Sequence, residues 1–121
     1  PAAVTDVINE KNKRIVRAKI IVEGANIPMS EKIERELSGR GILIVPDFVA
    51  NAGGVISSYA EYRGYNPEHM FELVEKKITE TTKTVLRKSI AEKRFPRDVA
   101  MEMAVKKVET RMKNRKQTFS A

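Results

Sequence analysis

The hydrophobic pattern of the first half of the chain predicts two strands with a short helix between them. A compact β-branched run predicts a buried strand over residues 18–23, and four consecutive apolar residues predict a second strand over residues 42–45. Between them, Ile33 and Leu37 form the apolar stripe of a short helix, and the hydroxyl of Ser30 is placed to cap its first turn. Strand, helix and strand at this spacing indicate a βαβ unit of a parallel sheet with a right-handed crossover. Because its apolar run does not alternate with polar residues, the second strand is expected to be buried on both faces.

The second half of the chain shows the three- and four-residue spacing of helices. A helix is expected over residues 51–63, and a long helix follows between an Asn-Pro cap at residues 66–67 and a break at residues 95–96. A last helix is expected over residues 97–114, and a weakly apolar one at the start, over residues 1–13. The apolar stripes of the two long helices are interpreted as core; they comprise Phe71, Val74, Ile78, Val85 and Ser89 or Ile90 in the first, and Met101, Ala104, Val105, Val108 and Met112 in the last.

These elements predict an α/β fold, in the form of a partial doubly wound (Rossmann-like) parallel sheet with a helical C-terminal extension. Two strands do not complete such a sheet, and each would have an unpaired edge. The chain also begins with Pro1 instead of Met. We therefore expect residues 1–121 to be a single piece of a longer protein.

Composition narrows the class of protein. Apolar residues make up 41% and charged residues 32% of the 121, which fits a folded globular protein. The sequence has no cysteine, which excludes disulfides, zinc–thiolate sites and thiol catalysis. No apolar run is long enough to span a bilayer and no secretory signal is visible, so a cytoplasmic protein without a membrane partner is expected.

The formal net charge of +7 raises the question of an acidic partner, because six cations crowd into residues 106–116 with only Glu109 against them. One interpretation is a surface that binds the phosphate backbone of a nucleic acid. The other is a solvated final helix whose cations favour the negative end of its dipole. No aromatic residues alternate with these cations and no known nucleic-acid motif occurs, so we favour the second interpretation and expect no nucleic-acid partner.

Two asparagines follow the carboxyl ends of the predicted strands, where open α/β sheets bind their ligands. Asn26 follows the first strand and Asn51 the second, so parallel strands would bring both amides to the same edge. An amide side chain both donates and accepts hydrogen bonds, as a carboxamide ligand requires. The alternative is structural, since asparagine is common in caps and turns and Asn51 is a candidate N-cap of its helix.

The helix expected after the second strand carries a candidate ligand-binding face. Asn51, Val55 and Ser58 fall at i, i+4 and i+7, which places an amide, an apolar side chain and a hydroxyl on one stripe. Such a stripe suits a small amphiphilic acid, whose carboxylate would accept a hydrogen bond from the hydroxyl. Gly53 and Gly54 weaken the first turn, which fits either the close approach of a ligand to the main chain or close packing of the helix. The serine, likewise, is either a ligand contact or a small residue at a helix contact.

The sequence resembles the glutamate/leucine/phenylalanine/valine dehydrogenases, and among them the glutamate dehydrogenases. The resemblance rests on GILIVPDFVANAGGVISSYAEY at residues 41–62, with support from RDVA at residues 97–100. It also includes GANIPM at residues 24–29, where the family usually reads GANGPT, so that Ile27 and Met29 stand in place of glycine and threonine.

The resemblance implies roles for the candidate residues. Asn26 and Asn51 would approach the nicotinamide end of NAD or NADP. Asn51 and Val55 would border the amino-acid site, and Ser58 would hold the side-chain carboxylate of the substrate. The implied parent enzyme is a homo-oligomer, a hexamer in this family, that interconverts glutamate with 2-oxoglutarate and ammonia.

The chemistry itself is expected to lie outside this chain. The catalytic lysine and aspartate of the family belong to its N-terminal domain, and the phosphate-binding G-x-G-x-x-G is missing here. Asp47, Glu61 and Asp98 are interpreted as isolated carboxylates without acid–base roles, and no cluster of metal ligands is visible. We therefore assign no catalytic residue and no metal site, and expect the chain alone to be inactive.

The resemblance also suggests how the chain is organised. Residues 1–121 would be the C-terminal part of a dinucleotide-binding domain, with the βαβ unit and active-site helix in residues 1–65 and the C-terminal helices in residues 66–121. Its partners would be the substrate and the rest of the parent chain. The alternative is a non-catalytic binding or regulatory module derived from the family, because the site is incomplete.

Overall fold

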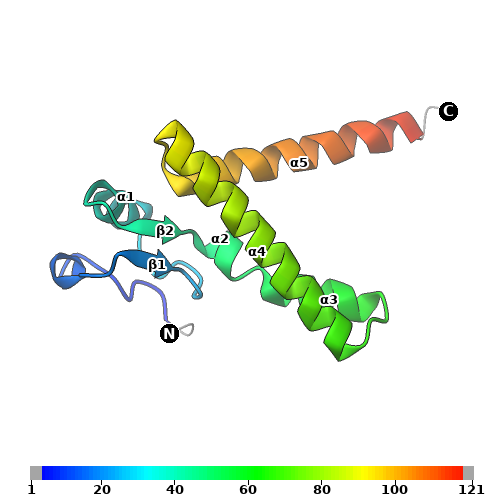
Figure 1. The fold of residues 1–121 in the computed structure, drawn as a ribbon, viewed down its shortest axis with the longest axis horizontal. Helices are drawn as coiled ribbons and strands as arrows, with labels where there is room; N and C mark the ends of the chain where they lie inside the picture. The colour runs from blue at the N-terminus through cyan, green and yellow to red at the C-terminus, as the bar shows by residue number, and fades with distance from the viewer. Residues whose placement is uncertain (1–3, 119–121) are drawn as a thin grey trace.

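The computed structural model describes residues 4–118, with side chains described as far as Asn114. In chain order, the elements are the 3-10 helix η1 (Lys13–Ile15), β1 (Ile20–Val22), α1 (Glu31–Gly39), β2 (Leu43–Val45), α2 (Asp47–Ala50), α3 (Gly53–Tyr62), α4 (Pro67–Glu92) and α5 (Pro96–Thr118) (Figure 1). This part of the chain is mostly helical with one two-stranded sheet. None of its helices is long and apolar enough to cross a membrane.

β1 and β2 pair in parallel and are joined by α1, which confirms the predicted βαβ unit. Ile20 is in register with Leu43, and Val22 with Val45. The prediction of a buried first strand is wrong, because Ile20 and Val22 are 59% and 63% exposed. These two side chains share one face of β1, and within residues 4–118 that face is open and β1 has a strand neighbour on one edge only.

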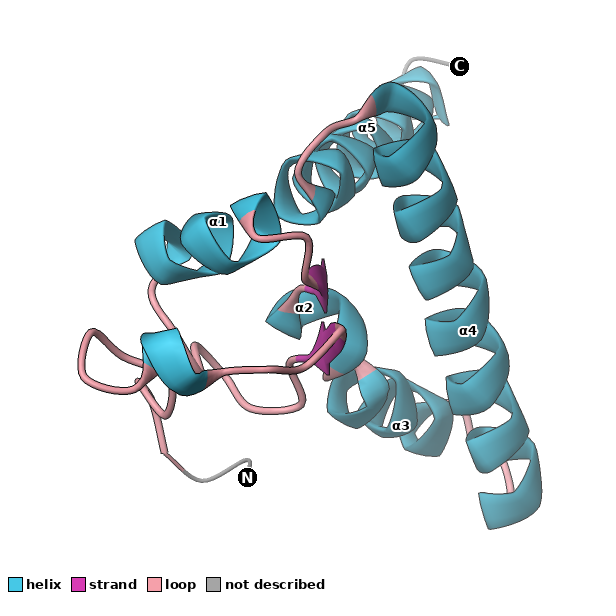
Figure 2. Cartoon of the chain, turned by 60° about the vertical axis from the view of Figure 1, so that its left-hand side comes forward, coloured by secondary structure: helices cyan, strands magenta, loops and turns pink. Residues whose placement is uncertain are grey.

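Two apolar clusters hold the sheet between helices, and Figure 2 shows α1 and α4 on opposite sides of the strands. α1 begins where its cap was predicted, since Ser30 Oγ accepts from the Ile33 N–H at 3.4 Å. The second cluster fixes α4 and the start of α5 against β2 and α2. The first cluster consists of Met29, Ile33, Leu37, Ile42 and Ile44, and the second of Val45, Val49, Val85, Val99 and Ala100.

The N-terminal segment does not form the predicted helix over residues 1–13. Residues 1–3 lie outside the described residues, and residues 4–12 form turns and bends that lead into η1. Asparagine side chains replace helical hydrogen bonds here: Asn12 Oδ1 accepts from the Asn9 N–H at 2.8 Å, and Asn9 Oδ1 accepts from the Lys11 N–H at 3.0 Å. Such local bonds from asparagine compete with helix formation.

The helix predicted over residues 51–63 is confirmed as α3, Gly53–Tyr62, and a separate short helix, α2, precedes it. Helical structure starts earlier, at Asp47, whose carboxylate accepts from the Phe48 N–H at 2.9 Å. Asn51 is the C-cap of α2, and Ala52 precedes α3 as its N-cap, so the prediction of Asn51 as an N-cap is wrong. A carboxylate stabilises the first turn of a helix, which explains why helical structure begins at Asp47, directly after β2, and not at Asn51.

The last two helices have the predicted boundaries to within a few residues. Asn66 Oδ1 caps α4 by accepting from the His69 N–H at 2.8 Å, with Pro67 in the first turn. The chain leaves α4 through Lys93 in the left-handed conformation, and α5 begins at Pro96. α4 and α5 thus meet at a sharp corner, from which α5 projects away from the sheet (Figure 1).

The interpretation of the helical stripes as core is correct for part of α4, where Val74 and Ile78 are also half-buried beside α3. Val85 and Ser89 of α4 are buried, whereas Phe71 near its start is 66% exposed. The prediction that the α5 stripe belongs to the core is wrong. Its exposed fractions are 48% to 57% at Met101, Val105, Val108 and Met112. Only the first turns of α5 reach the second cluster, and no other described element covers the projecting part of this stripe.

Candidate functional site

The two asparagines predicted at the sheet edge are in contact. Asn51 Nδ2 donates to Asn26 Oδ1 at 2.5 Å, across the loops that follow β1 and β2. Asn26 is exposed and Asn51 is half-buried. Within the described residues, the bond leaves Asn26 Nδ2 and Asn51 Oδ1 without a protein partner. This amide pair (Asn26 and Asn51) therefore presents a donor beside an acceptor, which complements a carboxamide.

Val55 and Ser58 lie one turn apart on α3, and both are exposed. Ser57 Oγ donates to the Gly54 carbonyl at 2.9 Å and is therefore engaged within its own helix. The Ser58 hydroxyl has no partner among the residues described, so it is the serine available to a ligand. Asn51 is the C-cap of α2 and lies before α3, so only Val55 and Ser58 of the three predicted residues belong to α3.

The structure separates the two glycines of α3. A Cβ atom at Gly53 would lie 3.4 Å from Val74 Cγ1 and 3.6 Å from Ile78 Cδ1, so this glycine is at the contact with α4. A Cβ atom at Gly54 would meet no described atom within 4 Å. A side chain at Gly53 would therefore make ordinary packing contacts with α4, whereas at Gly54 the main chain is open to an approaching group.

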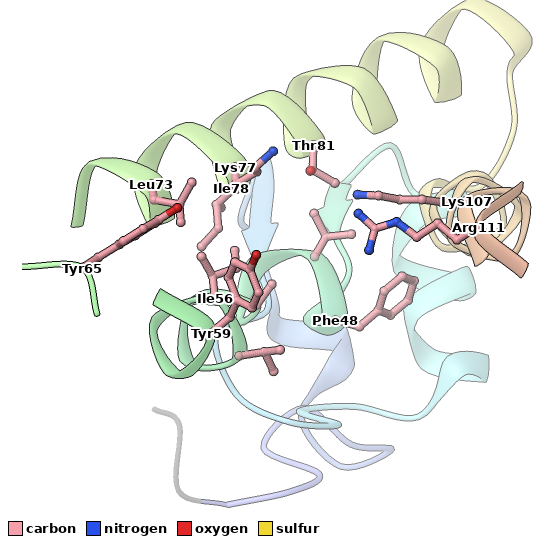
Figure 3. A pocket seen from close by; sticks show the side chains of 13 residues that line it. Phe48, Ile56, Tyr59, Tyr65, Leu73, Lys77, Ile78, Thr81, Lys107 and Arg111 are labelled. Carbon is pink, nitrogen blue, oxygen red and sulfur yellow. The ribbon is translucent and has the colours of Figure 1, made fainter. Parts of the chain in front are cut away.

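A pocket of about 670 Å³ lies between α3, α4 and α5 (Figure 3). Ile56 and Tyr59 line it from α3, and Lys107 and Arg111 reach into it from α5. Of the predicted site residues, only Val55 lines this pocket. The sequence analysis assigned these two cations to a solvated helix face. It could not reveal the pocket, because the other residues that line it come from distant segments of the chain.

A buried cluster of charges, the Arg97 cluster, joins the ends of both strands. Arg97 Nε binds Glu34 Oε2 at 2.5 Å, and its Nη2 binds Glu23 Oε2 at 3.0 Å and Asp47 Oδ1 at 3.1 Å. The Glu23 and Glu34 side chains are 0% exposed. The interpretation of Asp47 as an isolated carboxylate is wrong, and so is that of Asp98, which pairs with an arginine of α1 at 2.8 Å. One signal was present in the sequence, since Glu34 stands between Ile33 and Leu37 on a buried stripe.

The surroundings of the cluster separate the pKa values of its carboxyl groups. Burial and the nearby Glu34 carboxylate raise the pKa of Glu23 to about 7. Burial also raises the pKa of Glu34, against the opposing effect of Arg97. At Asp47, burial is outweighed by hydrogen bonds from the Ile27 and Phe48 N–H groups and by Arg97, so its pKa is lowered. Glu23 therefore holds its proton to a higher pH than an unperturbed glutamate does.

Replacing Glu23 by glutamine is expected to make the free energy of unfolding less sensitive to pH. The folded-state pKa of Glu23, about 7, lies above the value of 4.5 for an unperturbed glutamate. The folded state therefore binds the proton more tightly, and this contribution to stability is present at low pH and lost as pH rises from about 4.5 through about 7. Relative to wild type, Glu23→Gln should gain about 2 kcal/mol between about pH 5 and about pH 8. Urea unfolding at both pH values measures this, with exposed Glu61→Gln as the control; parallel pH profiles for wild type and Glu23→Gln would contradict it.

The loop that carries Asn26 contains an unfavourable backbone conformation. Ile27 has φ +49, in the left-handed region that β-branched residues avoid. Its N–H donates to Asp47 Oδ2 at 3.1 Å, and its side chain is 59% exposed. The family pattern GANGPT has glycine at this position, so the loop keeps the shape that glycine adopts freely although the residue has changed.

Replacing Ile27 by glycine is accordingly expected to raise the free energy of unfolding by about 1 kcal/mol. Relief of the left-handed conformation outweighs the greater chain entropy of glycine, and little buried surface is lost. Urea unfolding measures the change. Ile27→Ala is the control, since it shortens the side chain and keeps most of the strain; an equal gain in both variants would show that strain is not the cause.

The geometry first defines a class: an α/β protein with a parallel βαβ unit and a pair of hydrogen-bonded asparagines at the carboxyl edge of its sheet. Residues 1–116 match the family described as Glutamate/Leucine/Phenylalanine/Valine dehydrogenase. The chain belongs to this family, and the resemblance seen in its motifs is confirmed.

Individual relatives agree with this placement. The chain is 39% identical over 125 residues to the glutamate dehydrogenase of Aeropyrum pernix, covering 95% of the chain and 30% of the relative. It is 37% identical over 124 residues to the NADP-specific glutamate dehydrogenase of Saccharolobus shibatae, covering 95% of the chain and 29% of the relative. The chain thus spans less than a third of the length of these two relatives.

Two solved structures share the fold over nearly the whole chain. The L-tryptophan dehydrogenase of Nostoc punctiforme superimposes with a TM-score of 0.79 at 30% identity, over 97% of this chain and 34% of that one. The glutamate dehydrogenase of Peptoniphilus asaccharolyticus gives a TM-score of 0.79 at 29% identity, over 95% of this chain and 30% of that one. These two enzymes are named for different amino acids, so the shared fold alone does not identify a substrate.

Proposed function

We propose that the chain forms one wall of the active site of an NAD(P)-dependent amino-acid dehydrogenase, and that the substrate is glutamate. The observation that carries this proposal is the hydrogen bond between Asn51 and Asn26 at the carboxyl edge of the sheet. It holds two amides from separate segments in one place and leaves a donor and an acceptor without a partner among the described residues.

The roles follow from the chemistry of the side chains. The amide pair would bind the carboxamide of the nicotinamide ring and fix which face of the ring meets the amino acid. Val55 would form the apolar side of the amino-acid site, beside Asn51. The free hydroxyl of Ser58 would donate to the side-chain carboxylate of glutamate, which a leucine or phenylalanine substrate lacks. The bound cofactor supplies the hydride acceptor, and no residue of this chain is proposed as the acid or base.

The fold gives the proposal its wider setting. We propose that β1, α1 and β2 are the last βαβ unit of a Rossmann-like sheet whose other strands complete the open edges. Residues 1–65 would contain this unit together with α3. Residues 66–121 would form the C-terminal helices. The remaining wall of the site, the phosphate-binding loop and assembly as a homo-oligomer would then come from the rest of a longer chain and its copies.

The test is the oxidation of glutamate by the complete protein with NAD⁺ and with NADP⁺, followed by the absorbance of the reduced cofactor. The proposal expects glutamate-dependent reduction of at least one of the two cofactors and release of ammonia. Turnover of a neutral amino acid in preference to glutamate would keep the dehydrogenase and remove the role of Ser58.

A non-catalytic module derived from the family is the second candidate, because residues 1–121 carry no G-x-G-x-x-G loop. It predicts that the complete protein shows no turnover of any amino acid. Binding of a nicotinamide cofactor without turnover would favour this module, whereas turnover excludes it.

A further inference from the structure

Arg97 lies at the start of α5, yet its contacts are with the segments that follow both strands. The Arg97 side chain is 20% exposed, and it binds one carboxylate after β1, one after β2 and one on α1. These three partners are Glu23, Asp47 and Glu34. The guanidinium also lies over the ring of Phe48, 5.5 Å from its centroid. One cation therefore connects four elements in a mostly buried place.

The carboxylates bound by Arg97 lead directly to the amide pair. Asp47 Oδ2 accepts from the N–H of Ile27, the residue after Asn26, at 3.1 Å. The Asp47 N–H donates to Glu23 Oε2 at 2.8 Å, which ties the start of α2 to the end of β1. At the other end of α2, the Asn51 N–H donates to the Asp47 carbonyl at 2.8 Å. Asp47 thus fixes both loops, and Arg97 fixes Asp47.

The cluster also depends on Arg97 for its charge balance. Three carboxyl groups face one guanidinium, and Glu23 Oε1 and Glu34 Oε1 are buried without a partner in the described part of the chain. Removing the cation would leave these buried carboxyl groups without their shared hydrogen-bond donor, so they would have to take up protons or repel one another in a region of low dielectric. The segments that carry them would then move apart, and the two loops would separate.

We propose that Arg97 is a positioning residue for the amide pair, one that sets the distance between Asn26 and Asn51 through Asp47 and Glu23 and thereby the affinity for the nicotinamide cofactor. The inference rests on the proposed function, since it takes the amide pair to be the cofactor contact. It requires arginine specifically, because a planar guanidinium reaches three carboxylates at once and a lysine ammonium is a single point charge.

The first experiment compares Arg97→Lys with Arg35→Lys in the complete protein. Arg35 is a matched control: it also binds two carboxylates, Glu31 and Asp98, and lies over a phenylalanine ring, but it is exposed and binds neither of the carboxylates that follow the strands. Arg97→Lys is expected to raise the Kd for NADH or NADPH about tenfold or more, and Arg35→Lys to change it less than about twofold. Equal effects of the two variants, or an unchanged Kd in Arg97→Lys, would overturn the proposal.

A second pair of variants separates positioning from stability. Arg97→Met removes the cation, and Arg97→Met with Glu34→Gln restores the balance of charge without restoring a bridge between the loops. Affinity is measured at a temperature where circular dichroism shows each variant folded. A double variant that recovers thermal stability but keeps the weak affinity supports positioning; one that recovers both shows that Arg97 acts through stability alone. If neither methionine variant folds, the lysine variant decides.

A third measurement does not need the cofactor. Hydrogen exchange of the Ile27 amide reports its bond to Asp47, and this exchange should become faster in Arg97→Lys and stay unchanged in Arg35→Lys. Unchanged protection of Ile27 in Arg97→Lys would overturn the inference on its own. If wild type binds no nicotinamide cofactor, the proposed function fails; if Asn51→Leu weakens binding and Arg97→Lys does not, only the positioning role fails.

Discussion

Replacing Ser58 by alanine in the complete protein is expected to lower kcat/KM for glutamate about 10- to 100-fold and to leave kcat/KM for leucine within about twofold. The expected loss is that of a hydrogen bond donated to a charged group, which contributes about 1.5–3 kcal/mol. Leucine has no side-chain carboxylate, so its transition state loses no such bond. Initial rates at varied amino-acid concentration and saturating cofactor measure both values.

Ser57 provides the matched control for this prediction. It is the neighbouring serine on the same helix, but its hydroxyl is bonded to the Gly54 carbonyl. Ser57→Ala should therefore change kcat/KM for both amino acids by the same small factor. A loss in Ser58→Ala that is equal for glutamate and leucine would show that the hydroxyl does not read the side-chain carboxylate. This outcome would be informative because an L-tryptophan dehydrogenase shares the fold. Equal losses would indicate that the substrate is an amino acid other than glutamate.

Replacing either member of the amide pair by leucine is expected to raise the Kd for the nicotinamide cofactor about tenfold or more. Asn26→Leu and Asn51→Leu each remove one hydrogen bond to the carboxamide and also leave the remaining asparagine without its partner across the pair. Because the two side chains share a bond, their losses should not add. The double variant is expected to lose less than the sum of the two single variants, by about 1 kcal/mol.

Titration of NADH or NADPH fluorescence with wild type and the three variants completes this double-mutant cycle. Asn66→Ala is the control, since it removes an asparagine that caps α4 and should lower stability by about 1 kcal/mol without changing the Kd. Strictly additive losses at Asn26 and Asn51 would mean that the two amides bind independently. An unchanged Kd in both single variants would remove the amide pair from the cofactor site.

The parts of the fold that follow from local signals could be read from the sequence. Ser30 and Asn66 precede their helices with a free side-chain oxygen, and the structure has both caps in place. The apolar runs that form β1 and β2 could be recognised in the same way, and their parallel pairing brought Asn26 and Asn51 together as expected. The error at Asn51 has a local cause as well, since an additional helical turn starts at Asp47 and ends at Asn51.

The parts that the sequence did not reveal depend on contacts between distant residues. Arg97 and Glu23 are 74 positions apart, and nothing near either residue indicates that they meet. Exposure failed for a related reason. The stripe of α5 has the spacing of a core helix, but whether such a stripe is covered depends on what lies opposite, and no described element lies opposite Met101 or Met112.

The left-handed conformation of Ile27 has a consequence for the order of folding. Isoleucine does not adopt this conformation by local preference, so the loop after β1 has no tendency to form its native shape early. In the folded structure the Ile27 N–H donates to Asp47 Oδ2, so we expect the loop to take this shape once β2 is paired and α2 has started. We therefore expect the amide pair to be assembled late in folding, after the core of α1 and β2 has formed. Mutations in this loop should then change the unfolding rate and leave the folding rate nearly unchanged. A glycine at position 27 would remove the conformational penalty and make the loop depend less on that order of events.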